Sequence, residues 1–232
     1  MSENNVKVVL AHGAWADGSS WNKVIAGLRS EGVKALAAPL PLTSLADDVA
    51  ALTWTLERVD GPVVLVGHAY AGAVIASTSD EKVASLVYVT ALAPDEGETV
   101  TDIFYRTEPH PLAPQLAPDP HELIWLPEEA FARAFAQHAS PEEQALLAAT
   151  QRPLTAGSIG VPVGRPAWKD RPSWFLVAEE DRMIPAANQR FMAERMKARV
   201  RTVPADHLPM LTATTAVVDI VLEAVREVES GR

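Results

Sequence analysis

The chain contains no cysteine among its 232 residues, which excludes disulfides, thiolate metal ligands and a cysteine nucleophile. None of its apolar runs approaches the roughly 20 residues that a membrane-spanning helix needs. It also lacks an excess of positive charge, since 20 Lys and Arg stand against 30 Asp and Glu, for a formal net charge of −10. This balance disfavours nucleic acids and anionic membranes as partners, because both require clustered basic side chains.

The composition that remains is typical of a folded globular protein of one domain. Apolar residues make up 48% and charged residues 22% of the chain. The polar residues 1–5 do not resemble a secretory leader, so we expect a cytoplasmic location. The oligomeric state is open, and a homodimer is compatible with the sequence.

Strand-like and helix-like segments alternate along both ends of the chain. The strand-like segments are short, apolar and rich in β-branched residues, and the helix-like segments show apolar residues at helical spacing. This alternation predicts a mostly parallel sheet with helices on both faces. The predicted strands are 6–11, 33–37, 63–66, 84–90, 173–178 and 200–203. The predicted helices are 18–30, 45–56 with Ser44 as N-cap, 69–78, 186–196 and 213–228.

The texture changes between residues 96 and 168. This stretch is rich in proline and holds two amphipathic pieces, Glu128–His138 and Pro141–Thr150. It predicts a small helical lid inserted into a single domain that spans residues 1–232. The alternative is that it forms a loop-rich part of the core fold.

The third predicted strand runs directly into Gly67-His68-Ala69-Tyr70-Ala71 and then into a helix. Hydrolases with a G-x-S-x-G motif build a sharp turn at this point, which lifts the serine oxygen above the sheet. Small residues flank that turn because strand and helix nearly collide there. Here Ala69 occupies the nucleophile position. A plain strand–helix turn with glycines for packing is the alternative interpretation of this segment.

His12 and Gly13 follow the first predicted strand. In hydrolases of this kind the backbone N–H after such a motif, together with the N–H after the nucleophile, holds the oxyanion. By position these donors are Ala14 or Trp15, and Tyr70. An ordinary loop histidine beside a turn glycine is the alternative.

Asp181 follows the strand at 173–178, and His207 follows the strand at 200–203. Carboxyl ends of parallel strands meet at one edge of the sheet, which is where the predicted turn at Ala69 lies. The order of nucleophile, acid and histidine also matches the α/β-hydrolase triad. We therefore expect His207 as general base and Asp181 as its partner, with Glu180 and Asp206 as rival acids.

These segments resemble bacterial α/β-hydrolases related to the plant methyl-ester esterases and hydroxynitrile lyases. The resemblance rests on Val9–Trp21, Pro41–Val49, the turn at Ala69 and Glu180–Pro185, and it extends over nearly the whole chain. Relatives carry G-H-S-x-G-G or G-H-S-x-A-G at the turn. This chain departs at Ala69, and at Ala71 against the stricter pattern.

The resemblance implies a serine-type carboxylic ester hydrolase that works through an acyl-enzyme and needs no metal or organic cofactor. Alanine has no attacking oxygen, so the chain should bind esters and barely turn them over. Two origins fit Ala69, a deliberate serine-to-alanine change that traps substrate or a natural loss. The other features that the reaction needs, namely the candidate oxyanion donors, the histidine, the acid and the turn, are all present, which favours the deliberate change.

The expected ligand is a small apolar or aromatic ester, although lactones, carbamates and amides also fit. We expect His12, Gly13, Trp15, Tyr70, Trp125 and Leu208 to bind it, and further aromatic residues Phe104, Tyr105 and Phe131 are candidates for the pocket wall. Phe131 and Phe135, at helical spacing, favour packing within the lid.

Two other interpretations stay open. A histidine-driven lyase or cofactor-free oxygenase on the same fold needs no acyl-enzyme, and an oxygenase would tolerate Ala69 because the histidine alone can deprotonate its substrate. A ligand-sensing pseudoenzyme would bind one small molecule tightly and change its lid conformation. The fold does not distinguish these alternatives.

Overall fold

A sheet of six parallel strands forms the centre of the molecule, and the computed structural model describes residues 6–231. The expectation about residues 1–5 therefore lies outside the described part. The strand order is β2-β1-β3-β4-β7-β8, which puts β3 and β4 in the middle. Every residue of β3 and β7 is buried, as apolar strands covered on both faces should be. The predicted parallel sheet is confirmed. The strands are β1 Lys7–Ala11, β2 Lys34–Ala38, β3 Val63–His68, β4 Val83–Val89, β7 Ser173–Ala178 and β8 Arg199–Val203.

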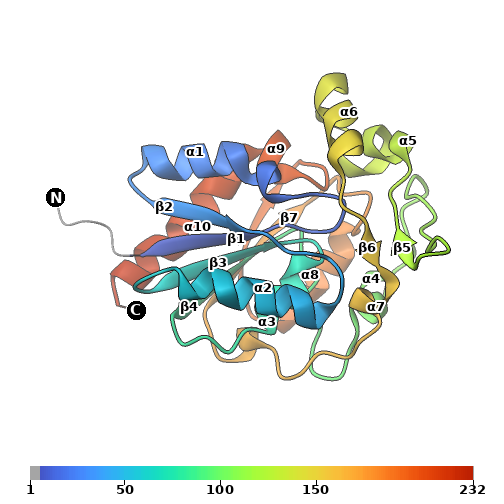
Figure 1. Cartoon of the computed structure of the whole chain (residues 1–232). Coiled ribbons are helices and arrows are strands. Elements are labelled where there is room, and N and C mark those ends of the chain that lie inside the picture. The colour runs from blue at the N-terminus through green and yellow to red at the C-terminus, as the bar shows by residue number, and fades with distance from the viewer. Residues whose placement is uncertain (1–5, 232) are drawn as a thin grey trace.

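Helices cover both faces of this sheet, as predicted. Helices α1 (Asn22–Ser30) and α10 (Thr214–Glu229) pack together on one face. Helices α2 (Leu45–Glu57), α3 (Ala71–Ala76) and α8 (Ala186–Arg195) cover the other (Figure 1). The predicted N-cap of α2 is confirmed, because the Ser44 hydroxyl accepts the Asp47 N–H at 3.0 Å.

Some boundaries differ from the sequence predictions for local reasons. The helix expected from residue 69 begins at Ala71, because Ala69 has a φ of +49°, which no α-helix contains. The amphipathic piece at 128–138 divides into α5 (Glu128–Ala130) and a π-helical turn, η2 (Phe131–Phe135). Two 3-10 turns are η1 (Gly18–Trp21) before α1 and η3 (Ala167–Lys169). Helix α9 (Pro209–Thr212) was not predicted.

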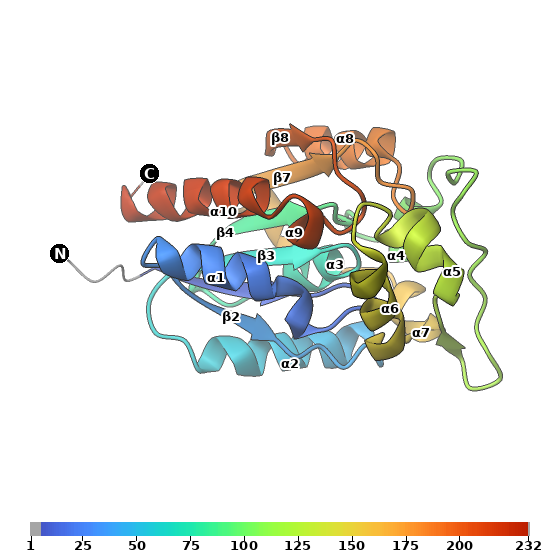
Figure 2. The ribbon, with the colours of Figure 1, turned by 90° about the horizontal axis from the view of Figure 1, so that it is seen from above.

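Most of the segment 96–168 lies beyond the carboxyl ends of the strands. Figure 2 shows its elements gathered at that end, and we call it the lid segment. It contains α4 (Val100–Phe104), α6 (Pro141–Thr150), α7 (Ala156–Ile159) and the antiparallel pair β5 (Leu123–Ile124) and β6 (Leu154–Thr155). Helix α6 starts with a capping box formed by Ser140 and Glu143, and Pro141 occupies its first turn.

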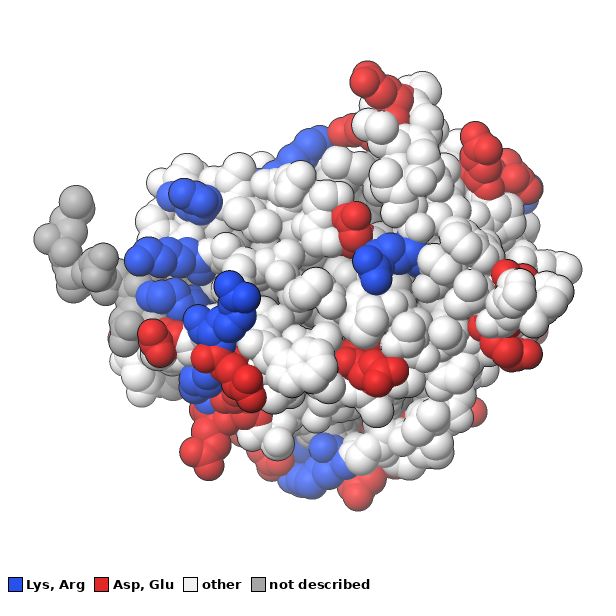
Figure 3. Space-filling view, in the orientation of Figure 1, with Lys and Arg blue, Asp and Glu red and all other residues white. Residues whose placement is uncertain are grey.

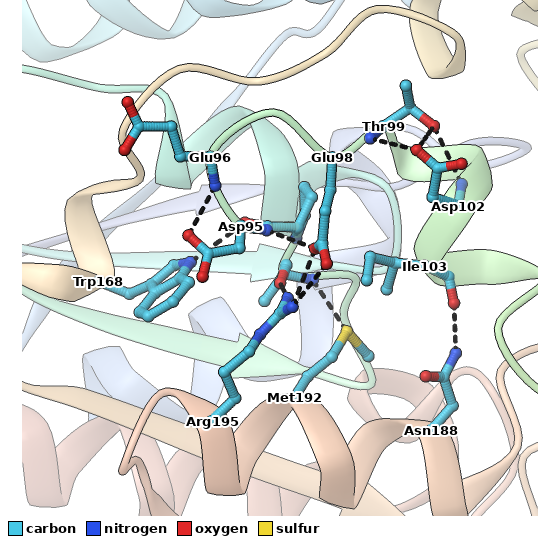
Figure 4. Close-up of polar contacts among 12 residues, drawn as sticks. Asp95, Glu96, Glu98, Thr99, Asp102, Ile103, Trp168, Asn188, Met192 and Arg195 are labelled. Carbon is cyan, nitrogen blue, oxygen red and sulfur yellow. Dashed lines mark hydrogen bonds and ion pairs between the residues drawn. The ribbon is translucent and has the colours of Figure 1, made fainter.

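Arg195 of α8 holds the chain where it leaves β4 for the lid segment (Figure 4). Its guanidinium contacts both oxygens of Glu98 at 2.9 Å and donates to the Ala93 carbonyl at 2.7 Å. Nearby, Asn188 donates to the Ile103 carbonyl at 2.6 Å. Helix α8 therefore holds both the connection between β4 and α4 and helix α4 itself.

Charges are distributed unevenly over the face seen in Figure 3. Most Lys and Arg side chains there gather at the end far from the lid segment, and mainly uncharged and acidic residues cover the lid side. Within residues 6–231, no helix combines the length and the apolar character that crossing a membrane requires.

Candidate functional site

Ala69 stands on a sharp turn between β3 and α3. Its φ of +49° is unusual for a residue with a side chain, and close packing holds it there. A Cβ added to Gly67 would lie 2.8 Å from the Ala71 carbonyl oxygen, and one on Gly72 would lie 2.3 Å from the Leu92 carbonyl oxygen. The Leu92 N–H also donates to the Ala69 carbonyl at 2.9 Å. The turn therefore has the strained geometry of a nucleophile elbow, with an alanine at its tip.

Asp181 and His207 meet at the same edge of the sheet. Nδ1 of His207 lies 2.8 Å from Oδ2 of Asp181, and both side chains are buried. The other oxygen of Asp181 accepts the N–H groups of Met183 at 2.8 Å and Ile184 at 2.9 Å, and Gln189 donates to Oδ2 at 2.8 Å. A carboxylate that only accepts hydrogen bonds assigns the proton to Nδ1, so Nε2 of the neutral His207 ring is the basic atom.

The two rival acids have other partners. Glu180 is exposed, and its carboxylate lies 3.0 Å from Nε2 of His138. Asp206 is buried, but it accepts from the His138 N–H at 2.9 Å and from the Thr212 hydroxyl at 2.6 Å. Asp206 therefore stabilises the loop that carries His207. Glu180 joins the loop after β7 to the lid segment through His138.

Two residues to which the sequence analysis gave no role contact the backbone carbonyl of His207. Nε2 of His68 lies 2.8 Å from the His207 carbonyl oxygen, and the Thr90 hydroxyl donates to the same oxygen at 3.2 Å. Burial holds the pKa of His68 well below its usual value, so its ring is neutral and donates through Nε2. His68 is an unspecified position of the general G-x-S-x-G motif, and that motif alone does not signal this contact.

Two backbone N–H groups remain free beside Ala69. In the part of the chain that the structure describes, the N–H groups of Ala14 and Tyr70 donate to no acceptor. The Trp15 N–H, by contrast, donates to the Arg152 carbonyl at 3.0 Å. The expectation that Trp15 could be an oxyanion donor is therefore wrong. Its indole N–H is also engaged, with the Ile124 carbonyl at 2.9 Å.

His12 and Gly13 lie behind the site. His12 is buried, and burial lowers the pKa of its ring, with Nδ1 3.0 Å from the Gly13 carbonyl oxygen. A Cβ on Gly13 would lie 2.9 Å from the Cβ of Ala69, so only glycine lets the two loops approach this closely. Neither residue lines the cavity in front of Ala69, so the expectation that they contact the ligand directly is wrong.

A cavity of about 310 Å³ opens in front of Ala69 and His207, and we call it the inner cavity. It has the size of a small-molecule site, and its wall is almost entirely apolar. The lid segment and the neighbouring loops supply most of this wall. Phe104 and Tyr105 lie there as expected, whereas none of the other lid residues that line it was named from the sequence. The lining residues are Ala14, Trp15, Ala69, Tyr70, Leu92, Val100, Thr101, Phe104, Tyr105, Leu116, Pro118, Ile124, Leu154, Ala156, Ile159, Met183, Ile184 and His207.

Three residues expected in this wall lie elsewhere. Trp125 is 47% exposed, and its indole N–H bonds to Asp119 at 3.3 Å. Leu208 is fully buried and faces a separate hollow beside α1 and α6. Phe131 packs in the lid core against Phe135, as the packing alternative predicts, and the Phe135 ring lies 5.2 Å from that of His207.

The sequence profile of the alpha/beta hydrolase family matches residues 8–220. The chain belongs to the alpha/beta hydrolase family. Among curated proteins, a carbendazim hydrolyzing esterase of Nocardioides sp. (strain SG-4G) is 30% identical over 124 residues. That match covers 46% of this alpha/beta hydrolase and spans half, 50%, of the length of that esterase.

Solved structures extend the comparison to almost the whole chain. A variant of polyneuridine aldehyde esterase superposes with a TM-score of 0.81 at 20% identity, covering 94% of this alpha/beta hydrolase and 99% of that chain. A pyrethroid hydrolase from Sphingobium faniae JZ-2 superposes with a TM-score of 0.80 at 22% identity, covering 95% and 98%. At these identities the likeness shows a shared fold, and the predicted α/β-hydrolase fold is confirmed.

Tyr70 adds a polar contact behind the cavity wall of this alpha/beta hydrolase. Its hydroxyl donates to Asp48 of α2 at 2.7 Å, and the same carboxylate accepts the Leu42 N–H at 2.7 Å. Burial raises the pKa of Asp48, although these hydrogen bonds act against the rise. Burial and the Asp48 charge likewise raise the pKa of Tyr70 far above its usual value, so its phenol stays protonated.

Proposed function

We propose that this site belongs to a serine-type hydrolase of small apolar or aromatic carboxylic esters, and that alanine at residue 69 disables it. The observation that carries the proposal is the buried pair of Asp181 and His207, joined at 2.8 Å, with His207 lining the same cavity as Ala69. The esterase relative supports a small-molecule ester as ligand. The apolar wall supports an uncharged one.

With serine at residue 69, the residues have these roles. Nε2 of His207 takes the serine proton while the serine oxygen attacks the ester carbonyl. The N–H groups of Ala14 and Tyr70 hold the negative oxygen of the tetrahedral intermediate. His207 then gives its proton to the leaving alcohol, and a water molecule activated by the same ring releases the acid from the acyl-enzyme. Asp181 orients the ring and stabilises its charged form.

Changing Ala69→Ser tests the proposal directly. Loss of a triad nucleophile costs on the order of 10⁶ in kcat, so we expect the serine form to gain at least about 10³ in aryl-ester hydrolysis. Ala71→Ser is the matched control, because it adds the same hydroxyl on α3 and should gain nothing. His207→Ala in the serine form should abolish the gain. A serine form as inert as the alanine form overturns the proposal.

A second function is favoured by the free ring nitrogen of His207. In the described part of the chain Nε2 has no hydrogen-bond partner, while Asp181 holds Nδ1. Such a ring can deprotonate an acidic ligand without any acyl-enzyme, as a lyase or a cofactor-free oxygenase requires. This function predicts turnover of acidic heteroaromatic phenols or cyanohydrins by the Ala69 chain, lost in His207→Ala and not improved by Ala69→Ser.

A further inference from the structure

A second hollow lies beside the inner cavity, and we call it the outer hollow. It has a volume of about 500 Å³. Part of its wall is its own, formed by Pro109, residues 113–115, Ala117 and Pro185. The rest is shared, because Phe104, Tyr105, Leu116 and Met183 line both spaces. The two spaces are therefore neighbours separated by four side chains.

Most side chains of the outer wall are apolar, although polar atoms also line it, and proline restricts its backbone. Among its own wall residues Gln115 has the only polar side chain, and the others are alanine and proline. The loop that builds it carries Pro109, Pro111 and Pro114, whose rings fix φ and reduce the entropy lost on ordering. A wall restricted in this way can receive an apolar group at a low entropic cost. Tyr105 is 52% exposed at the boundary between the two spaces, where a ligand would cover it.

The shared wall lies on the histidine side of the site. Met183 follows Asp181 by two residues, and its N–H bonds to the carboxylate that orients His207. In the proposed mechanism His207 protonates the leaving alcohol, so the alcohol part of a bound ester points toward this side. The walls formed by Leu154, Ala156 and Ile159 border the inner cavity alone, which leaves that space for the acyl part.

We propose that the outer hollow binds the alcohol portion of the ester, and that the substrates are esters of extended apolar alkyl or aryl-alkyl alcohols. This inference rests on the proposed function. It assigns the two halves of the substrate to different walls, the acyl half to the inner cavity and the alcohol half to the loop at residues 109–117.

Two isomeric esters test the assignment. Phenylbutyl acetate carries its apolar mass on the alcohol, and methyl phenylpentanoate carries the same mass on the acid. Because the Ala69 chain should not consume either ester, calorimetric titration gives equilibrium affinities. Ala117→Trp fills the outer hollow from an exposed position, and Ala145→Trp on the exposed face of α6 is the matched control.

We expect Ala117→Trp to weaken phenylbutyl acetate by about tenfold or more, the equivalent of losing burial of two methylene groups, and to leave methyl phenylpentanoate within about twofold. Ala145→Trp should change neither affinity. Thermal unfolding of both variants checks that the lid segment stays folded, and Ala113→Phe fills the same hollow if Ala117→Trp does not fold.

Each other pattern overturns the assignment. If Ala117→Trp lowers the affinity for the methyl ester alone, the acyl and alcohol halves bind in the opposite places. If it lowers both affinities equally, or neither, the outer hollow does not contribute specifically to binding the alcohol half. Absence of binding by both esters to the unchanged chain refutes the proposed function itself, which distinguishes the two failures.

Discussion

The Tyr70 hydroxyl donates a hydrogen bond of 2.7 Å to the fully buried carboxylate of Asp48. Tyr70 follows Ala69, the proposed nucleophile position, and its backbone N–H donates to no acceptor in the described part of the chain. The same carboxylate holds Leu42, whose carbonyl accepts the N–H of Thr155 in lid strand β6. One buried acid thus joins the elbow to the lid segment.

Tyr70→Phe should destabilise the protein. It leaves a buried carboxylate oxygen without its donor, at a cost of about 1.5–3 kcal/mol in the free energy of unfolding. Tyr88→Phe is the matched control, because the buried Tyr88 hydroxyl has no hydrogen-bond partner in the described part of the chain and its loss should be neutral or stabilising. Urea denaturation measures both variants. Equal effects would contradict the role given to Asp48.

Asp48→Asn should change how stability depends on pH. Burial raises the folded pKa of Asp48 above its ordinary value of 3.8, so the folded protein binds this proton more tightly than the unfolded chain does. The contribution of Asp48 to the free energy of unfolding is therefore greatest below pH 3.8 and falls as pH rises through the folded pKa, by at most about 1.4 kcal/mol per pH unit.

The measurement for Asp48 is the free energy of unfolding of both proteins at a series of pH values. The value for the unchanged protein minus that for Asp48→Asn should decrease with pH in this window and be flat above it. A difference that increases with pH would mean that the hydrogen bonds from Tyr70 and Leu42 outweigh burial.

Gly72→Ala should be strongly destabilising. Its Cβ would lie 2.3 Å from the Leu92 carbonyl oxygen, a backbone atom that cannot move without shifting the cavity wall, so we expect a loss of about 1–3 kcal/mol or more. Gly157→Ala in α7 is the control, since nothing lies within 4 Å of its added Cβ and its φ is not positive. That change should be neutral or stabilise by up to about 1 kcal/mol. Thermal denaturation that ranks the two variants the other way would contradict the geometry of the turn.

Arg195→Gln should loosen the connection between β4 and the lid segment. The Arg195 side chain is 18% exposed and bonds both Glu98 oxygens and a backbone carbonyl, so its loss should cost about 1–3 kcal/mol. Arg190→Gln on the same helix removes a surface pair with Glu179, worth less than about 1 kcal/mol. Guanidinium denaturation compares the two variants. If Arg195→Gln loses no more free energy of unfolding than Arg190→Gln, Arg195 does not hold the connection between β4 and the lid segment.

Local patterns in the sequence predicted the architecture and the positions of the proposed site residues. Apolar, β-branched runs identified the strands of the main sheet. Burial on both faces explains such runs in β3 and β7, whereas the edge strands β2 and β8 are partly exposed. Glycines around the turn at Ala69, and polar residues directly after two strands, located Asp181 and His207 because chemistry in this class of fold gathers at the carboxyl edge. Their adjacency in space then followed from the parallel topology.

Contacts between distant segments were decided only by the tertiary structure. Whether the Trp15 N–H is free depends on Arg152 of the lid segment, 137 residues away in sequence, since 152 − 15 = 137. The choice of Asp181 over Glu180 depends on which way each side chain leaves the end of β7. Asp48, a polar residue in a predicted helix, became a buried partner of Tyr70 because α2 packs on α3. Periodicity determines which residues face inward, and the packing of whole elements determines which of them meet.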